Sequence, residues 1–206
     1  MKIVVPEFLE KENKLNKLDN LSICKYIQYE EDGFRKEVFI STNMLFFVMH
    51  GTKVLHFKDK KVDVNLQDVL FLKSGDYVMS EILDGYYEAI LFMYDDTILL
   101  DFIKKYNLSF DDTSSFENNY FKIRKTSAFE IFQSSVISYL ETNSSNQESI
   151  MRLKLEEAFL NILESQSKES FKAFLASIYN NNLFKIKIEK EFRYDENVLL
   201  FAKEFN

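Results

Sequence analysis

Residues 22–94 consist of short runs rich in Val, Ile, Phe and Tyr that are separated by turn-forming residues. Branched and aromatic side chains pack well on a pleated surface, so each run favours a β-strand. The runs cover residues 23–29, 37–40, 44–50, 53–57, 62–66, 69–72, 77–82 and 86–94. All four glycines of the chain fall in the breaks between runs, where turns are expected. This spacing predicts an all-β sandwich or barrel built from hairpins.

The run from Met44 to Met49 is apolar at every position, whereas a strand with one wet face alternates apolar and polar residues. Both faces of this strand should therefore be covered, and something must pack outside the barrel. The rest of the chain supplies helices for this role, because helical spacing of apolar residues begins after Asp95, with Asp95 or Asp96 as N-cap. Further helices are expected near residues 128–140, 148–165 and 169–180, after a short strand at 120–123.

Charge and cysteine content restrict the class of protein. The net charge of −7 over 206 residues opposes binding to a phosphate backbone, so this chain should contact DNA poorly by itself. The single cysteine, Cys24, excludes an internal disulfide and favours a cytoplasmic protein. The longest apolar run is far shorter than the roughly 18 residues that a membrane-spanning helix requires, so no membrane association is expected.

The residues needed for catalysis are sparse. The chain has two histidines, His50 and His56, and lacks a His-x-His pair of the kind that binds metals across barrel strands. It also lacks a glycine-rich phosphate loop and a nucleophile elbow. The sequence therefore predicts neither a metal, nor a cofactor, nor an enzyme.

The predicted helix at 148–165 has two apolar stripes. One is the core face, and the other consists of Leu153 and Leu160, flanked by glutamates that include Glu157 and Glu164. A second stripe edged by charge is typical of a helix that also meets a partner, which predicts a homodimer interface. The alternative is that another helix of the same chain, at 169–180, covers these leucines.

Residues 44–81, MLFFVMHGTKVLHFKDKKVDVNLQDVLFLKSGDYVMSE, resemble the cupin-like core of AraC-type transcription regulators, particularly the subgroup of type III secretion activators. LFMYDDTILLDFIKKYNL at 91–108, RLKLEEAFLNILESQ at 152–166 and FKAFLASI at 171–178 are similar to the linker and dimerisation helices of that family. The resemblance implies an α+β fold, in which a cupin-like, jelly-roll β-barrel is followed by a helical dimerisation segment. It also implies an effector-sensing role.

The resemblance predicts three parts of the chain. Residues 1–125 form the cupin-like sensing barrel with one inserted helix, and residues 126–182 form the helical linker and dimerisation segment. Residues 183–206 begin a helix-turn-helix domain, because DENVLLFAKEFN at 195–206 is similar to its first helix. A recognition helix would have to follow. The chain is thus expected to be a regulatory half that reaches DNA only through a missing domain; a plain amphipathic terminal helix is the alternative for the tail.

A barrel of this size has room for one small ligand. The candidate wall residues lie on strands with apolar faces: Phe46, Val48, Phe57, Phe71, Tyr77, Met79 and Phe92. They favour an apolar effector, for instance a fatty or aromatic acid whose carboxylate meets Lys53 or Lys73. Two alternatives stay open. The barrel could sense a regulatory protein partner through its surface, or the chain could be a stand-alone carrier of a hydrophobic small molecule.

Overall fold

The computed structural model describes residues 2–12, 15–29, 35–110, 119–142 and 145–183. Its strands are β1 (Ile3–Val5), β2 (Leu15–Leu18), β3 (Leu21–Gln28), β4 (Lys36–Ile40), β5 (Asn43–His50), β6 (Thr52–His56), β7 (Lys61–Val64), β8 (Asp68–Leu72), β9 (Gly75–Ile82), β10 (Tyr87–Tyr94) and β11 (Tyr120–Arg124). Its helices are α1 (Glu7–Lys11), α2 (Asp96–Lys105), α3 (Ser127–Leu140), α4 (Gln147–Leu163) and α5 (Lys168–Asn181).

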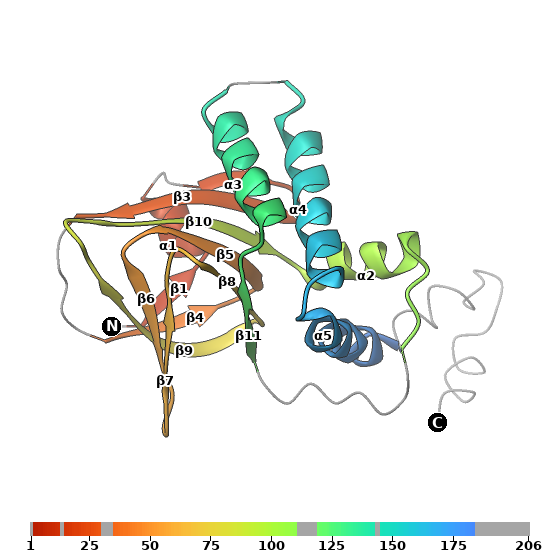
Figure 1. The fold of residues 1–206 in the computed structure, drawn as a ribbon, viewed down its shortest axis with the longest axis horizontal. Coiled ribbons are helices and arrows are strands. Elements are labelled where there is room, and N and C mark those ends of the chain that lie inside the picture. The colour runs from red at the N-terminus through yellow and green to blue at the C-terminus, as the bar shows by residue number, and fades with distance from the viewer. Residues whose placement is uncertain (1, 13–14, 30–34, 111–118, 143–144, 184–206) are drawn as a thin grey trace, which may run out of the picture.

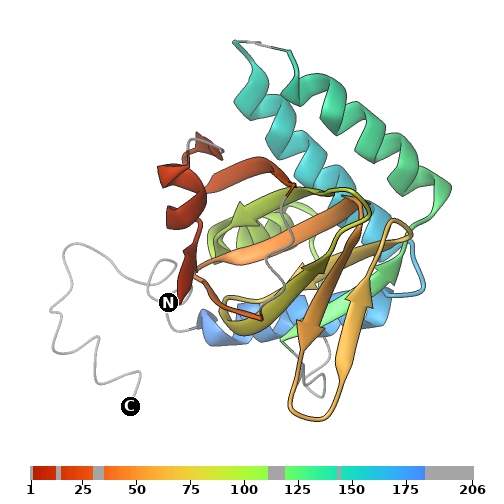
Figure 2. The ribbon, with the colours of Figure 1, turned by 90° about the vertical axis from the view of Figure 1, so that its left-hand side faces the viewer.

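The strands form two sheets with jelly-roll-like topology (Figure 1). The smaller sheet has the order β1-β4-β9-β6-β7, and the larger has the order β11-β8-β5-β10-β3-β2. Within the described residues these sheets stay separate layers and do not close into a single barrel. Helices α2 to α5 cover the outer face of the larger sheet, whereas α1 lies at the other side of the molecule, next to β1 (Figure 2).

Strand β5 is buried on both faces, as its apolar sequence predicts. Leu45 and Phe47 point to the helices, whereas Met44, Phe46 and Val48 point between the sheets. The strand is also hydrogen-bonded on both edges, to β10 and to β8. Residues 43–48 are thus buried in the fold, whereas Met49 and His50 at the end of the strand are partly exposed.

The helical layer and the larger sheet share an aromatic core. The Phe71 ring stacks on Phe121 with centroids 4.8 Å apart and meets Phe174 edge-on at 4.7 Å. On the same face, Phe47 lies 5.2 Å from Phe132. Such ring pairs contribute about 0.5–1.5 kcal/mol each beyond the area they bury. The helices are therefore held to the sheet mainly by packed rings.

The eight predicted strands between residues 22 and 94 are all present, as are the strand at β11 and the four predicted helices. The N-terminal elements β1, α1 and β2 were not predicted, since each has at most five residues and carries little periodicity. The predicted start of a helix-turn-helix at 195–206 lies outside the described residues.

Replacing Phe71 by Ala should lower the free energy of unfolding by about 3–5 kcal/mol, because the cavity is bounded by several rings that cannot close over it. Urea denaturation followed by circular dichroism measures this change. Leu66, which is half exposed in the turn before β8, is the matched control, and its replacement by Ala should cost less than about 0.5 kcal/mol. Equal losses in the two variants would contradict this account of the core.

Candidate functional site

A cavity of about 100 Å³ lies between the two sheets. It is bounded by β3, β4, β5, β6, β9 and β10, and by β1 and α1 at the N-terminal side. Its apolar lining consists of Ile3, Val5, Phe8, Leu9, Val38, Ile40, Met44, Phe46, Met79 and Leu91, with the rings of Tyr26 and Tyr87. An enclosed apolar cavity of roughly 150 Å³ is enough to hold benzene. At about 100 Å³ the present cavity is smaller, so it has room for a small apolar group or for one end of a longer apolar molecule.

One part of the cavity wall is charged. Lys53 on β6 and Glu81 on β9 are directly opposite each other in the antiparallel register, and the Lys53 ammonium forms an ion pair with the Glu81 carboxylate. Their side chains are only 15% and 6% exposed. The Lys53 Nζ also lies 5.7 Å from the centre of the Tyr87 ring, and Lys36 completes the charged lining. The cavity is thus an apolar space with two lysines and one carboxylate at its wall.

The Tyr87 hydroxyl lies in this charged region and is fully buried. Burial raises its pKa well above the ordinary value, and the nearby Glu81 carboxylate adds to the effect. The phenol is therefore neutral at physiological pH and can donate a hydrogen bond to a polar group placed beside it.

The predicted pocket residues divide into two groups. Phe46 and Met79 line the cavity, and Val48 and Tyr77 belong to the same core between the sheets. The Tyr77 hydroxyl is within hydrogen-bond distance of the Lys73 and Asn119 carbonyl oxygens, at 2.7 and 2.9 Å. Phe57 packs at the edge of this core, where its ring stacks on Tyr120.

The prediction that Phe71 and Phe92 line the pocket is wrong, because both side chains point away from the cavity into the aromatic core under the helices. The cause is strand parity, since successive residues of a strand face opposite sides of the sheet. Of the two lysines expected to meet a carboxylate, Lys53 lines the cavity, whereas Lys73 donates a hydrogen bond to Ser177 on α5 at 3.0 Å.

Four lining residues come from the N-terminal segment and were missed: Ile3, Val5, Phe8 and Leu9. Strand β1 pairs in parallel with β4, which places Val5 opposite Ile40. The only sequence signal was the apolar patch at Ile3 to Val5. Pairing between such distant strands leaves no local pattern.

The two histidines lie apart from the cavity lining. His50 stacks on Tyr86 with ring centroids 4.0 Å apart, and its Nε2 is 2.6 Å from the Asp84 carbonyl oxygen. His56 is within 2.8 Å of the Ser80 hydroxyl. In the part of the chain that the structure describes, no group of three or more His, Cys, Asp or Glu side chains is arranged to hold a metal ion.

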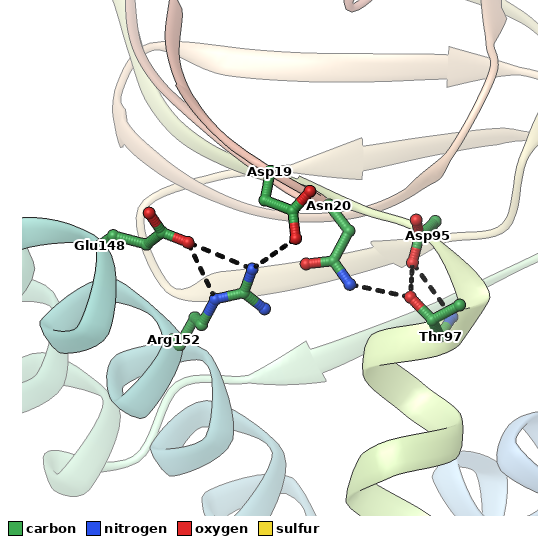
Figure 3. Close-up of polar contacts among 6 residues, drawn as sticks. All are labelled: Asp19, Asn20, Asp95, Thr97, Glu148 and Arg152. Carbon is green, nitrogen blue, oxygen red and sulfur yellow. Dashed lines mark hydrogen bonds and ion pairs between the residues drawn. The ribbon is translucent and has the colours of Figure 1, made fainter.

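Polar contacts connect the larger sheet to the helical layer beside the β2–β3 turn (Figure 3). Asp95 is the N-cap of α2 and accepts a hydrogen bond from the Thr97 backbone N–H at 3.0 Å. The Asn20 amide donates to the Thr97 hydroxyl at 2.8 Å. A few residues away, Arg152 on α4 meets Asp19 at 3.5 Å. These contacts fix the start of α2 and the first half of α4 against one turn of the sheet.

Asp96 joins the strand that lines the cavity to the end of the last described helix. Its Oδ1 accepts a hydrogen bond from the Asn43 amide at 2.8 Å, and its Oδ2 accepts one from the Asn182 amide at 3.3 Å. Asn43 begins β5 immediately before the cavity residue Met44, and Asn182 is the C-cap of α5. One carboxylate therefore bridges the wall of the cavity and the end of α5.

The second apolar stripe of α4 is exposed. Leu153 is 61% and Leu160 is 37% exposed, so α5 does not cover them and this alternative is wrong. Alongside them, Glu157 forms an ion pair with Lys154 at 2.7 Å, and Glu164 is the C-cap residue of the helix. The other face of α4, with Met151, Leu155 and Phe159, is buried as predicted.

The fold matches solved structures of ToxT from Vibrio cholerae. An apo variant of ToxT is 14% identical over 92% of this chain and 74% of its own, with a TM-score of 0.57. ToxT with a bound unsaturated fatty acid is 11% identical over 92% and 70%, with a TM-score of 0.53. ToxT bound to (E)-4-(8-methylnaphthalen-1-yl)but-3-enoic acid is 14% identical over 91% and 76%, also with a TM-score of 0.53. No curated protein sequence matches this chain.

These matches confirm the α+β, cupin-like fold with its helical C-terminal segment. The family model described as the ExsA N-terminal regulatory domain matches residues 43–174, which is more than half of the chain. The chain belongs to that family. Every helix among the described residues is too short or too polar to cross a membrane.

Replacing Asp95 by Ala should lower the free energy of unfolding by about 1 kcal/mol, because the N-terminal backbone of α2 loses its side-chain acceptor. Thermal or urea denaturation measures the loss. Asp101 lies exposed on the same helix, and its replacement by Ala should cost less than about 0.5 kcal/mol. If both substitutions cost the same, Asp95 does not stabilise the sheet–helix junction as a cap.

Proposed function

We propose that this regulatory domain senses an apolar carboxylic acid, which binds between the sheets with its carboxylate directed at Lys53 and Lys36. The observation that carries this proposal is an apolar cavity whose polar wall contains two lysines. Apolar lining with a few placed polar groups is the common character of small-molecule sites. The two ligands named in the ToxT structures are both apolar acids, which supports the same ligand class here.

The bound acid would act on the rest of the protein through β5. Met44 lines the cavity, and the adjacent Asn43 holds Asp96, which in turn holds Asn182 at the end of α5. A ligand that binds more tightly to one arrangement of β5 shifts the population toward it. The end of α5 is the point from which the chain continues toward the segment that resembles a helix-turn-helix. A shift there can change how an attached DNA-binding domain is held.

The domain also forms a homodimer through α4 in this proposal. Leu153 and Leu160 are an exposed apolar stripe with a cation, Lys154, and an anion, Glu157, beside it. A two-fold interface brings the same patch of both copies together, so a patch with both charges can pair with itself. A second copy is therefore the occupant that the stripe fits best.

The remaining assignments follow from this role. The domain regulates and does not catalyse, it works in the cytoplasm, and DNA is reached only through a helix-turn-helix domain joined after residue 182. The net charge of −7 supports the assignment of effector sensing and DNA binding to different domains, because it opposes DNA binding by the regulatory half. A stand-alone carrier is the second candidate, favoured by the cavity alone. Sensing of a protein partner at the surface is an outcome that the following experiments distinguish.

Decanoate should bind the purified protein, and Val38→Phe should weaken this binding at least about tenfold, since the added ring fills space that the ligand needs. Val38 lines the cavity, whereas Leu163 packs in the helical core and supplies the matched variant Leu163→Phe, which should bind normally. Isothermal titration calorimetry measures both affinities. Absence of decanoate binding to the wild-type protein would remove the effector proposal and favour a protein partner.

Replacing both Leu153 and Leu160 by Glu should convert the dimer into a folded monomer, because like charges would then face each other across the two-fold axis. Analytical ultracentrifugation gives the mass, and circular dichroism checks the fold. Ile82→Glu changes an equally exposed apolar residue on the smaller sheet and should leave the dimer intact. A dimer that survives the double substitution would show that α4 is not the interface.

A further inference from the structure

Glu81 is an unusual residue for the wall of an apolar cavity. Its side chain is 6% exposed, lines the cavity and forms an ion pair with Lys53. Taking two charges out of water is costly, and apolar residues of similar size often replace such a pair without loss of stability. The rest of the lining offers apolar contacts that could have continued across this position. Stabilising the pairing of β6 with β9 therefore does not by itself explain why this ion pair is present in the cavity wall.

The geometry points to that role. Lys53 and Glu81 are directly opposite each other in neighbouring antiparallel strands, and both belong to the cavity lining. The Lys53 ammonium is the group that an incoming carboxylate would meet in the proposed function. In the structure that ammonium is already bound by a carboxylate of the protein itself.

We infer that Glu81 is an internal competitor for the effector, and thereby a specificity-determining residue of the cavity. This inference rests on the proposed function. The ligand carboxylate binds by taking the place of Glu81 on Lys53, and the displaced Glu81 turns toward the neutral Tyr87 hydroxyl or out of the cavity. A ligand without an acidic group cannot make this exchange and must bind beside the intact ion pair.

Two consequences separate this role from a purely structural one. Removing the charge of Glu81 should strengthen binding of an acid, because Lys53 then has no other anion, whereas a structural brace would weaken binding when it is lost. The change should also be confined to acids. A neutral molecule of the same length does not compete with Glu81, so its affinity should hardly depend on this residue.

The test compares decanoate with 1-decanol on the wild-type protein, Glu81→Gln and Lys53→Met. Glu81→Gln should bind decanoate at least about tenfold more tightly. A neutral amide holds the Lys53 ammonium less strongly than a carboxylate does, so the ligand carboxylate displaces it more easily. Lys53→Met should bind decanoate at least about tenfold more weakly than the wild-type protein. Decanol affinity should change less than about threefold in both variants. Titration calorimetry measures all six affinities.

The double variant Lys53→Met/Glu81→Met keeps the test valid if a single variant fails to fold, because it leaves no unpaired charge in the cavity. In this double variant the preference for decanoate over decanol, measured as the ratio of their affinities, should be lost. Unchanged or weaker decanoate binding in Glu81→Gln would overturn the competitor role while the proposed function stands. If neither decanoate nor decanol binds any of the proteins, the proposed function itself fails.

Discussion

The burial of β5 on both faces over residues 43–48 is the constraint on which the rest of the structure depends. Because Leu45 and Phe47 face one side and Met44, Phe46 and Val48 face the other, this strand needs cover on both faces. The smaller sheet supplies one cover and the helices α2 to α5 supply the other. The smaller sheet and the helical layer thus each bury one face of β5. The larger sheet, which contains β5, lies between them and contacts both.

This position of the larger sheet explains how a cavity on one side can influence a helix on the other. The cores on the two faces have different characters. The helical side is filled by stacked rings around Phe71, whereas the side between the sheets leaves the cavity and its charged wall. Hydrogen bonds from Asn43 and Asn182 to Asp96 connect the two sides at the start of β5. A close-packed interior transmits small displacements, so the ring-filled side can carry a change in β5 to α5.

Much of this arrangement could be predicted from the sequence, because the relevant signals are local. The apolar runs and the turns between them predicted the strands of the two sheets. The spacing of residues alone predicted the N-cap at Asp95 and the buried face of α4. Parity was harder, since residues 69–72 are all apolar and nothing marks which of them faces the helices. Phe71 and Phe92 were therefore placed on the wrong side of the sheet.

The least predictable features depend on pairing between distant segments. The parallel pairing of β1 with β4 brings Ile3 and Val5 to the cavity, although their sequence separation hides this contact. Glu81 was not predicted because an acidic residue on an alternating strand is usually exposed. Only the register between β6 and β9 places it against Lys53. Long-range register, and not residue type, thus decides which charges reach the cavity.

The most direct test of the central claim is methyl NMR on protein labelled at the methionine methyl groups, titrated with decanoate. Met44 and Met79 line the cavity, whereas Met151 is buried in the helical core on the other face of the sheet. If the cavity is the effector site, the Met44 and Met79 signals shift most strongly and saturate with the calorimetric affinity. If those two signals stay unchanged at saturating decanoate, the acid binds elsewhere and the account is contradicted.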